Sequence, residues 1–150
     1  MKKLTIRPAN NTDLSDLLPL LEQLEYPTSE TAIEKRFERF VNKDGYGITV
    51  ACLDEEVIGF IAWSKSLFFV SDKTRFHIEA IAVDEAHKRL GAGKKLIDYV
   101  EEIAKKAAPS VVDLTSGVRR ASEGIHEFYK NLGYKNDGFM AKLYLKKEFL

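Results

Sequence analysis

The spacing of hydrophobic and polar positions along the 150-residue chain changes several times between its two ends. Leu4–Arg7 alternates between apolar and polar residues, which predicts a short strand. Two amphipathic helices are expected next, the first capped by Thr12 and the second by Ser29. Pro19 lies inside the first helix and should kink or shorten it. Their apolar faces comprise Leu14, Leu17, Leu18, Leu21 and Leu24 in the first helix and Ile33, Phe37, Phe40 and Val41 in the second.

The middle of the chain changes to runs of apolar and β-branched residues. Gly47–Leu53 and Val57–Trp63 predict two strands, and the polar segment Asp54-Glu55-Glu56 between them predicts a hairpin turn. A third strand is expected over Arg75–Val83, after a loop around Ser71-Asp72-Lys73. The pattern therefore favours an antiparallel sheet in this part of the chain.

The second half of the chain returns to helical spacing. A long amphipathic helix is expected from about Gly93, and a short buried strand follows it over Val111–Leu114. Ser122 is expected to cap another helix, which ends at Gly133. Phe139–Lys146 alternates again and predicts a closing strand.

The resulting order is β-α-α-β-β-β-α-β-α-β-β, which predicts an α/β (α+β) fold with a mixed, mostly antiparallel central sheet and helices on both faces. The strand–helix–strand unit from Arg75 to Leu114 should form a right-handed parallel crossover. The length suits one domain, and neither an internal repeat nor a linker divides the chain. Residues 1–150 are therefore expected to form a single domain.

Charge and composition narrow the classes of function. The 23 Lys and Arg residues balance 23 Asp and Glu residues, so nothing global indicates binding to nucleic acid or to an anionic membrane. The single cysteine, Cys52, excludes an intramolecular disulfide, and its apolar surroundings predict a buried, unreactive thiol. Because no apolar run is long enough for a signal peptide or a membrane span, a cytoplasmic protein is expected.

One local segment departs from this neutral background. His87–Lys95 reads His-Lys-Arg-Leu-Gly-Ala-Gly-Lys-Lys at the predicted start of the long helix. Two glycines two residues apart allow a sharp turn that brings backbone N–H groups close to a ligand, and a helix N-terminus favours an anion. The segment also carries four cations, which a bound polyanion would attract: Lys88, Arg89, Lys94 and Lys95.

The spacing in this loop excludes two familiar phosphate-binding motifs. Leu96 stands where a dinucleotide-binding fingerprint needs its third glycine, and no Ser or Thr follows a Gly-Lys pair as in a Walker loop. A glycine-rich connector with solvated lysines is the alternative that the pattern alone leaves open.

The stretch Ile78–Gly93, which contains this loop, resembles the central strand and acyl-CoA loop of the GNAT acyltransferase superfamily. In that family the loop normally begins with Gln or Arg; Lys88 stands in that place, and a lysine keeps the charge but lacks the planar fork of arginine. His126–Tyr134 is similar to a second family segment, in which Phe-Tyr is followed after three residues by Gly-Phe. Ser122 stands where relatives often carry Asn or Arg.

The resemblance implies acetyl-CoA as the cosubstrate. It implies that acetyl-CoA lies between two parallel strands that splay apart, here Arg75–Val83 and Val111–Leu114, with the backbone of the first paired to the pantetheine arm. No metal is expected, because the three histidines lack ligand-like spacing with carboxylates. The cofactor site implied by the resemblance comprises Ile81, Ala82, Val83, Lys88, Arg89, Leu90, Gly91, Ala92, Gly93, Lys94, Ser122 and Tyr129.

The implied reaction is direct attack of a primary amine on the thioester. Tyr129 takes the family's tyrosine position near the sulfur and is expected to act as the acid for the thiolate, whereas its spacing from Ile125 alone predicts a core residue. Glu79 is the expected base, directly or through water; a structural ion pair is the alternative for a carboxylate in an apolar strand. His77 is not expected to share a cleft with Glu79, and His126 is expected to be a packing or surface residue.

The identity of the acceptor stays open between a small-molecule amine, a peptide amino terminus and a lysine side chain. Two further functions also stay open: a catalytically silent acyl-CoA-binding module that regulates a partner, and an unrelated nucleotide- or phosphate-binding domain. The resemblance also allows a homodimer. The acceptor-site positions that it implies, for which solvated charges and core aromatics are the alternative, are Glu22, Glu25, Tyr26, Glu30, Trp63, Phe68 and Phe69.

Overall fold

The computed structural model describes residues 1–116, 124–136 and 145–150. The chain forms two compact units, Met1–Thr115 and Ser116–Leu150. The cap predicted at Ser122 and most of the strand predicted over Phe139–Lys146 lie outside the described residues. The single domain expected for residues 1–150 stays a prediction.

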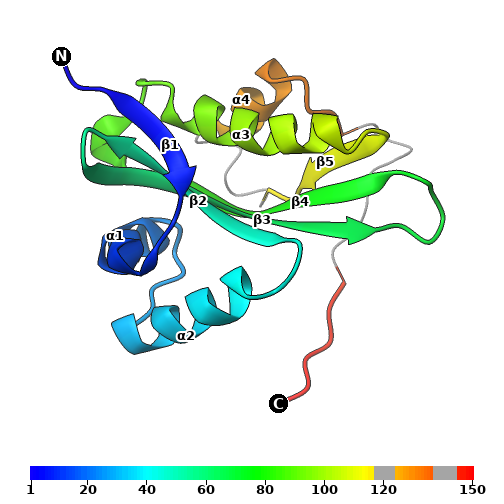
Figure 1. Ribbon diagram of the computed structural model, residues 1–150, viewed down its shortest axis with the longest axis horizontal. Helices are drawn as coiled ribbons and strands as arrows, with labels where there is room; N and C mark the ends of the chain where they lie inside the picture. Colours follow the sequence, from blue (N-terminus) through cyan, green and yellow to red (C-terminus); the bar gives the residue numbers. More distant parts are fainter. Residues whose placement is uncertain (117–123, 137–144) are drawn as a thin grey trace. The chain divides into compact units, whose positions relative to one another are not determined.

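The described part of the first unit is built on a five-stranded sheet in which neighbours along the chain are also neighbours in space (Figure 1). The first four strands pair antiparallel, and the fifth pairs parallel to the fourth. This confirms the mixed, mostly antiparallel sheet and the parallel crossover. The strands are β1 (Leu4–Pro8), β2 (Tyr46–Leu53), β3 (Glu56–Leu67), β4 (Thr74–Val83) and β5 (Ser110–Leu114).

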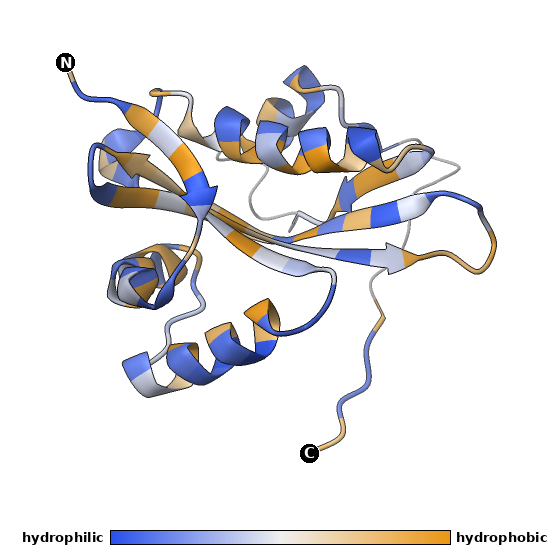
Figure 2. Cartoon of the chain, viewed as in Figure 1, coloured by the Kyte–Doolittle hydropathy of each residue, from blue (hydrophilic) through white to orange (hydrophobic). Residues whose placement is uncertain are grey.

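Helices cover both faces of this sheet, as the sequence predicted. In Figure 1, α1 and α2 lie against one face and α3 against the other. The apolar side of α3 faces the sheet (Figure 2), as expected for an amphipathic helix. The helices are α1 (Leu14–Gln23), α2 (Glu30–Val41) and α3 (Ala92–Lys106), with short 3₁₀ turns over Asn11–Asp13 and Glu85–His87.

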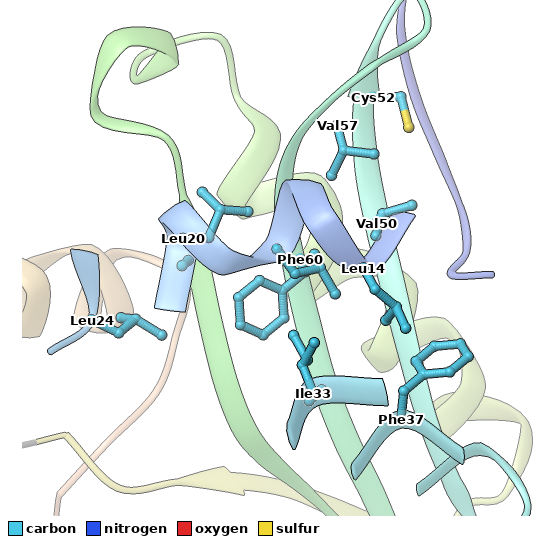
Figure 3. Packing of buried hydrophobic residues seen from close by; sticks show 12 residues of the cluster. Leu14, Leu20, Leu24, Ile33, Phe37, Val50, Cys52, Val57 and Phe60 are labelled. Atoms are coloured by element: carbon cyan, nitrogen blue, oxygen red, sulfur yellow. The ribbon is translucent and has the colours of Figure 1, made fainter. Parts of the chain in front are cut away.

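A hydrophobic core lies between α1, α2 and the sheet (Figure 3). Leu14 and Phe37 reach into it from the helices, and Phe60 reaches into it from β3. Cys52 is also buried there, and burial raises the pKa of its thiol, in agreement with the unreactive cysteine that was expected. Val41, which was predicted on the inner face of α2, is instead 39% exposed at the last turn of the helix.

The start of the first helix differs from the prediction. Asn10, rather than Thr12, caps the 3₁₀ turn that leads into α1: its side chain accepts a hydrogen bond from the backbone N–H of Thr12 at 3.0 Å, and Asp13 stands at the N-cap position of α1 itself. The side chain of Asp13 accepts a hydrogen bond from the backbone N–H of Asn10 in return, so the two residues form a capping box. Pro19 lies inside α1, which continues past it to Gln23. The Ser29 cap of α2 is confirmed, because its hydroxyl accepts a hydrogen bond from the N–H of Ala32 at 3.1 Å.

Asp13 also joins β1 to this helix start. Both carboxylate oxygens accept hydrogen bonds of 2.8 Å from the guanidinium of Arg7, while the Asp13 side chain is only 5% exposed. The hydrogen bonds from Arg7 hold the pKa of the Asp13 carboxyl below its usual range. Protonating Asp13 is therefore unfavourable in the folded state.

Asp13→Asn is expected to lower the free energy of unfolding at pH 7 by about 1–3 kcal/mol. Breaking a fully buried pair costs about 3–5 kcal/mol, but the Arg7 side chain is 39% exposed and solvent screens the loss. Since folding lowers the carboxyl pKa, the pair stabilises the wild type above the unfolded pKa of about 3.9 and loses its effect as the pH falls through the folded pKa. Urea unfolding at pH 7 and below pH 4 should show a difference between the two proteins that shrinks in acid; a constant difference would contradict this account.

The described part of the second unit is centred on one short helix. This helix, α4, runs over Ile125–Asn131, with Gly124 at its N-cap position. It ends as predicted at Gly133, whose φ is +94° and whose N–H donates to the carbonyl of Lys130 at 2.9 Å. Tyr129 packs edge-on against two other rings, with centroid distances of 5.2 Å to Phe128 and 6.0 Å to Tyr134.

Candidate functional site

The parallel strands β4 and β5 separate halfway along β4. Their pairing runs from Thr74 opposite Ser110 to Ile78 opposite Leu114, and it stops there. β4 continues for five more residues, to Val83, and β3 flanks it on the other side. Within the part of the chain that the structure describes, this last part of β4 therefore has no strand along its outer edge, which is the splayed pair that the sequence predicted.

A β-bulge lies where the two strands separate. Ala62 of β3 lies opposite Ala80, and Trp63 lies opposite Ile78, so no β3 residue lies opposite Glu79. A bulge re-aims side chains and is common beside functional sites. Here it lies at Glu79, the residue that the sequence predicted as a base.

The direction of the β4 backbone groups follows from one hydrogen bond. The N–H of Asp84 donates to the carbonyl of Ile58 in β3 at 2.7 Å. Because successive residues of a strand turn their backbone polar groups to opposite edges, those of Val83 and Ile81 point to the outer edge. The carbonyl of Val83 accepts a hydrogen bond of 2.8 Å from the side-chain amide of Gln23.

Gln23 therefore ties the end of α1 to the start of the loop after β4. Its side-chain oxygen also accepts a hydrogen bond of 3.0 Å from the backbone N–H of Glu85. Nothing in the amino-acid sequence indicates this role, because a glutamine in the last turn of an amphipathic helix is usually an ordinary surface residue. Gln23 is the clearest contributor to the site geometry that sequence reasoning missed.

Glu79 projects from the bulge on the face covered by α1 and α2. One of its carboxylate oxygens accepts a hydrogen bond of 2.8 Å from the hydroxyl of Ser64, a buried residue of β3. Glu79 is exposed, and among the described residues it forms no ion pair with Lys or Arg, so the expected alternative of a structural ion pair is wrong for this part of the chain. A carboxylate held by one hydroxyl and open to solvent retains acceptor capacity for a ligand.

His77 lies on the same face of the sheet as Glu79, and the prediction that the two residues do not share a cleft stays a prediction. His77 lies directly opposite Ser64 in the β3–β4 ladder, and opposite residues share a face. The Nδ1 atom of His77 lies 2.7 Å from Asp113 of β5 and 3.1 Å from the guanidinium of Arg75. The guanidinium of Arg75 also donates to Asp113 at 2.8 Å, so these three residues hold the paired ends of β4 and β5 together.

The loop after β4 contains two residues in the left-handed conformation. Gly91, with φ +82°, is the N-cap residue of α3, so the helix begins one residue before the predicted Gly93. Arg89 is also left-handed, with φ +71°, which is unusual for a residue that has a side chain. Left-handed residues that interrupt a turn bring successive N–H groups together into an anion-binding nest. The loop thus presents backbone donors next to the N-terminus of a 15-residue helix.

The cations of this loop are partly neutralised by neighbours. Lys88 pairs with Glu85 at 2.8 Å, and Lys94 pairs with Asp98 at the same distance. All four side chains are at least 45% exposed, so these pairs contribute little and can exchange partners. The positive charge assigned to the loop from its sequence is therefore smaller than four cations suggest.

Two of the predicted site residues belong to the second unit. Tyr129 is half-buried on α4, and Ser122 lies outside the described residues. The roles expected of Tyr129 and Ser122 stay predictions. His126, on the same helix, is half-buried, which agrees with the packing or surface residue that was expected.

Trp63, one of the aromatic residues named for the acceptor site, lies on the opposite face of the sheet from Glu79. Its neighbours Ala62 and Ser64 point toward the α1 and α2 side, so Trp63 points to the opposite one. There its ring lies 6.4 Å from that of Phe76, and it covers Gly47 so closely that an added Cβ would lie 2.5 Å from it. Trp63 is thus a packing residue.

No helix in the described parts of the chain is long and apolar enough to cross a membrane. The same parts contain no group of three or more His, Cys, Asp or Glu side chains placed to hold a metal ion.

Comparison with known proteins matches residues 12–134 to the acetyltransferase (GNAT) family. An uncharacterized N-acetyltransferase of Methanocaldococcus jannaschii is 29% identical over 142 residues, which cover 90% of this chain. The chain spans 62% of that protein's length.

Solved structures agree in fold. An acetyltransferase of Trypanosoma brucei is 25% identical, with a TM-score of 0.74 over 99% of this chain and 100% of that one. A GNAT family acetyltransferase of Staphylococcus aureus is 23% identical, with a TM-score of 0.72 over the whole of both chains. An aminoglycoside N-acetyltransferase in complex with CoA is 20% identical, with a TM-score of 0.81 over 99% of this chain and 97% of that one.

Proposed function

This chain belongs to the acetyltransferase (GNAT) family, and from that premise we propose that it transfers the acetyl group of acetyl-CoA to a primary amine. The observation that carries the proposal is the separation of β4 from β5 at Ile78, immediately before Glu79. The opening, a carboxylate and the anion-binding loop follow one another along a single stretch of chain. That order suits an extended ligand with a diphosphate at one end and a reactive group at the other.

The described residues fit acetyl-CoA in two respects. The outer edge of β4 offers backbone groups of Ile81 and Val83 to which the pantetheine arm pairs as an added strand would. The carbonyl of Val83 already accepts a hydrogen bond from Gln23. The N–H of Val83 and the N–H and carbonyl of Ile81 are therefore the groups available to pair with the pantetheine arm. The loop from Lys88 to Lys94 offers its backbone nest and the α3 N-terminus to the diphosphate. When bound, acetyl-CoA supplies an acetyl thioester that an amine attacks directly.

In this proposal Glu79 accepts a proton from the acceptor amine and Tyr129 donates a proton to the leaving thiolate. An alkyl ammonium with a pKa of about 10.4 is neutral about 0.04% of the time at pH 7, so the acceptor must lose a proton before it can attack. Glu79 accepts that proton, directly or through water, while Ser64 fixes the orientation of its carboxylate. As the C–N bond forms and the C–S bond breaks, the hydroxyl of Tyr129 protonates the departing thiolate. The second proton, which the nitrogen loses as it becomes an amide, returns through water to the Tyr129 phenolate, and Glu79 releases the first proton to solvent.

The proposal is tested by incubating the full chain with acetyl-CoA and a panel of amines, and by measuring free thiol together with acetylated product. We expect thiol release above background hydrolysis, in equal amounts with product, for at least one amine. Acetyl-CoA should also stabilise the chain in thermal unfolding, by about 2.7 kcal/mol at a hundredfold excess over its dissociation constant. Stabilisation without thiol release from any amine would instead support a silent acyl-CoA-binding module, and competition by ATP as strong as that by CoA would support a nucleotide-binding domain.

A further inference from the structure

A cavity of about 220 Å³ lies between α1, α2 and the sheet, on the face from which Glu79 projects. The cavity is partly open to solvent, because the side chains of Glu79 and Arg36 on its wall are exposed. Of the twelve described residues that line it, ten are apolar and two are charged, Glu79 and Arg36. Figure 3 shows Ile33 and Phe37 of α2 and Phe60 of β3 directed into the region between the helices and the sheet.

The cavity and the bulge belong to one site. Glu79 and Ala80 both line the cavity, and these two residues mark the place where β4 leaves β5. The carboxylate of Glu79 is the one anionic group among the described lining residues, and its bond to the hydroxyl of Ser64 leaves it able to accept hydrogen bonds from an ammonium. An amine bound there has its nitrogen beside the open edge of β4 and its remaining atoms among apolar side chains.

The volume of the cavity limits the size of the apolar part of the amine. An apolar cavity of about 150 Å³ lined by Leu, Ile and Phe side chains stays dry and binds benzene. A cavity of about 220 Å³ therefore accommodates a six-membered ring with a short chain, or a branched aliphatic group of similar volume. A polar acceptor would gain no binding free energy in this apolar cavity, because its hydroxyl and amino groups would lose hydrogen bonds to water.

Arg36 adds a restriction on charge. It lines the cavity from α2, it is exposed, and among the described residues it forms no ion pair. A second positive charge on the acceptor would be repelled by its guanidinium, whereas a single ammonium can lie against Glu79. The charges therefore favour a monoamine over a polyamine.

Resting on the proposed acetyl transfer, we propose that the acceptor is a primary monoamine carried on a compact apolar body, which occupies the cavity between α1, α2 and the sheet while its ammonium pairs with Glu79. This narrows the acceptor class that the sequence left open. It disfavours polycationic substrates and the lysine side chains of basic peptides.

The test compares three amines on the full chain in the presence of CoA: 2-phenylethylamine, ethanolamine and spermidine. Calorimetry measures binding without chemistry, and thiol release from acetyl-CoA measures turnover. We expect the dissociation constant of 2-phenylethylamine to be about 10–100-fold lower than that of ethanolamine, the gain that burial of one aromatic ring provides. Equal or weaker binding of 2-phenylethylamine overturns the proposal.

Two variants that fill the cavity from different strands supply the structural control. Ala62→Leu and Ile48→Phe should each weaken binding of 2-phenylethylamine at least tenfold and leave the affinity for CoA unchanged. The matched control is Val57→Leu, which enlarges a buried residue of the same core that does not line the cavity. If Val57→Leu lost 2-phenylethylamine binding as well as both filled variants, the cavity would not be assigned as the acceptor site. The same holds if both filled variants bound 2-phenylethylamine as tightly as the wild type.

Arg36→Gln tests the restriction on charge. It should raise kcat/KM for spermidine several-fold relative to 2-phenylethylamine, and an unchanged ratio overturns that part of the proposal. The two levels of proposal fail separately. Turnover of ethanolamine or peptides with no binding of 2-phenylethylamine contradicts the apolar acceptor alone, whereas binding of 2-phenylethylamine without thiol release from any amine contradicts the proposed transferase.

Discussion

Glu79→Gln is expected to lower kcat for acetyl transfer by about 10²–10⁴-fold, the range that general-base catalysis usually contributes. Gln keeps the size of the side chain and can still accept a hydrogen bond from Ser64, but it cannot accept the proton of the ammonium. The affinity for CoA should stay within about twofold, because the loop that is proposed to hold the diphosphate is untouched. Steady-state kinetics of thiol release across a range of pH, together with CoA titrations, check both statements.

Glu56→Gln is the matched control, since Glu56 is an exposed carboxylate at the start of β3 and does not line the cavity. It should leave kcat and its pH dependence unchanged. If Glu79→Gln retained both the wild-type kcat and the wild-type pH–rate profile, Glu79 would not be the base, and a water or another side chain would have to take that role.

Gly91→Ala is expected to raise the dissociation constant of CoA by about 5–30-fold. A left-handed backbone costs a residue with a Cβ about 1–2 kcal/mol, and Gly91 has φ +82° at the N-cap of α3. Nothing lies within 4 Å of an added Cβ, so the expected effect comes from the backbone conformation of the loop. Gly91→Val should weaken CoA further, because a β-branched residue adopts this φ still less readily.

The control for this loop is Gly45→Ala, because Gly45 has the same φ of +82° and lies before β2, away from the loop. Gly45→Ala should destabilise the fold more than Gly91→Ala does, because the added Cβ would lie 3.1 Å from the carbonyl oxygen of Lys65. Calorimetric titration with CoA should therefore show wild-type affinity for Gly45→Ala despite a lower melting temperature. Equal losses of affinity in both variants would assign the effect to general destabilisation.

The order of the elements over the described residues, and the five-stranded sheet, could be predicted because their hydrophobic periods are long and regular. The cap before α1 could not be chosen from the sequence, because Asn10 and Thr12 are both good cap residues and the reciprocal bond with Asp13 decides between them. The cation-rich loop was recognisable from Gly91 and Gly93, but the left-handed conformation of Arg89 was not, because nothing in an arginine's chemistry indicates it.

Alternation alone does not give the faces of β4, although Phe76, Ile78, Ala80 and Ala82 stand at every second position of the strand. In the structure Ala80 and Ala82 pack with the core under α1 and α2, whereas Phe76 and Ile78 are buried outside that core. The bulge at Glu79 exchanges the two faces, and a regular alternation cannot reveal an extra residue inside it.

A crystal structure of the full chain with bound CoA tests the central proposal most directly. We predict the diphosphate within hydrogen-bonding distance of the backbone N–H groups around Gly91 and Gly93, and the pantetheine arm along the outer edge of β4 beside Ile81 and Val83. CoA bound elsewhere, or a strand occupying that edge of β4 while the loop contacts no phosphate, would contradict it.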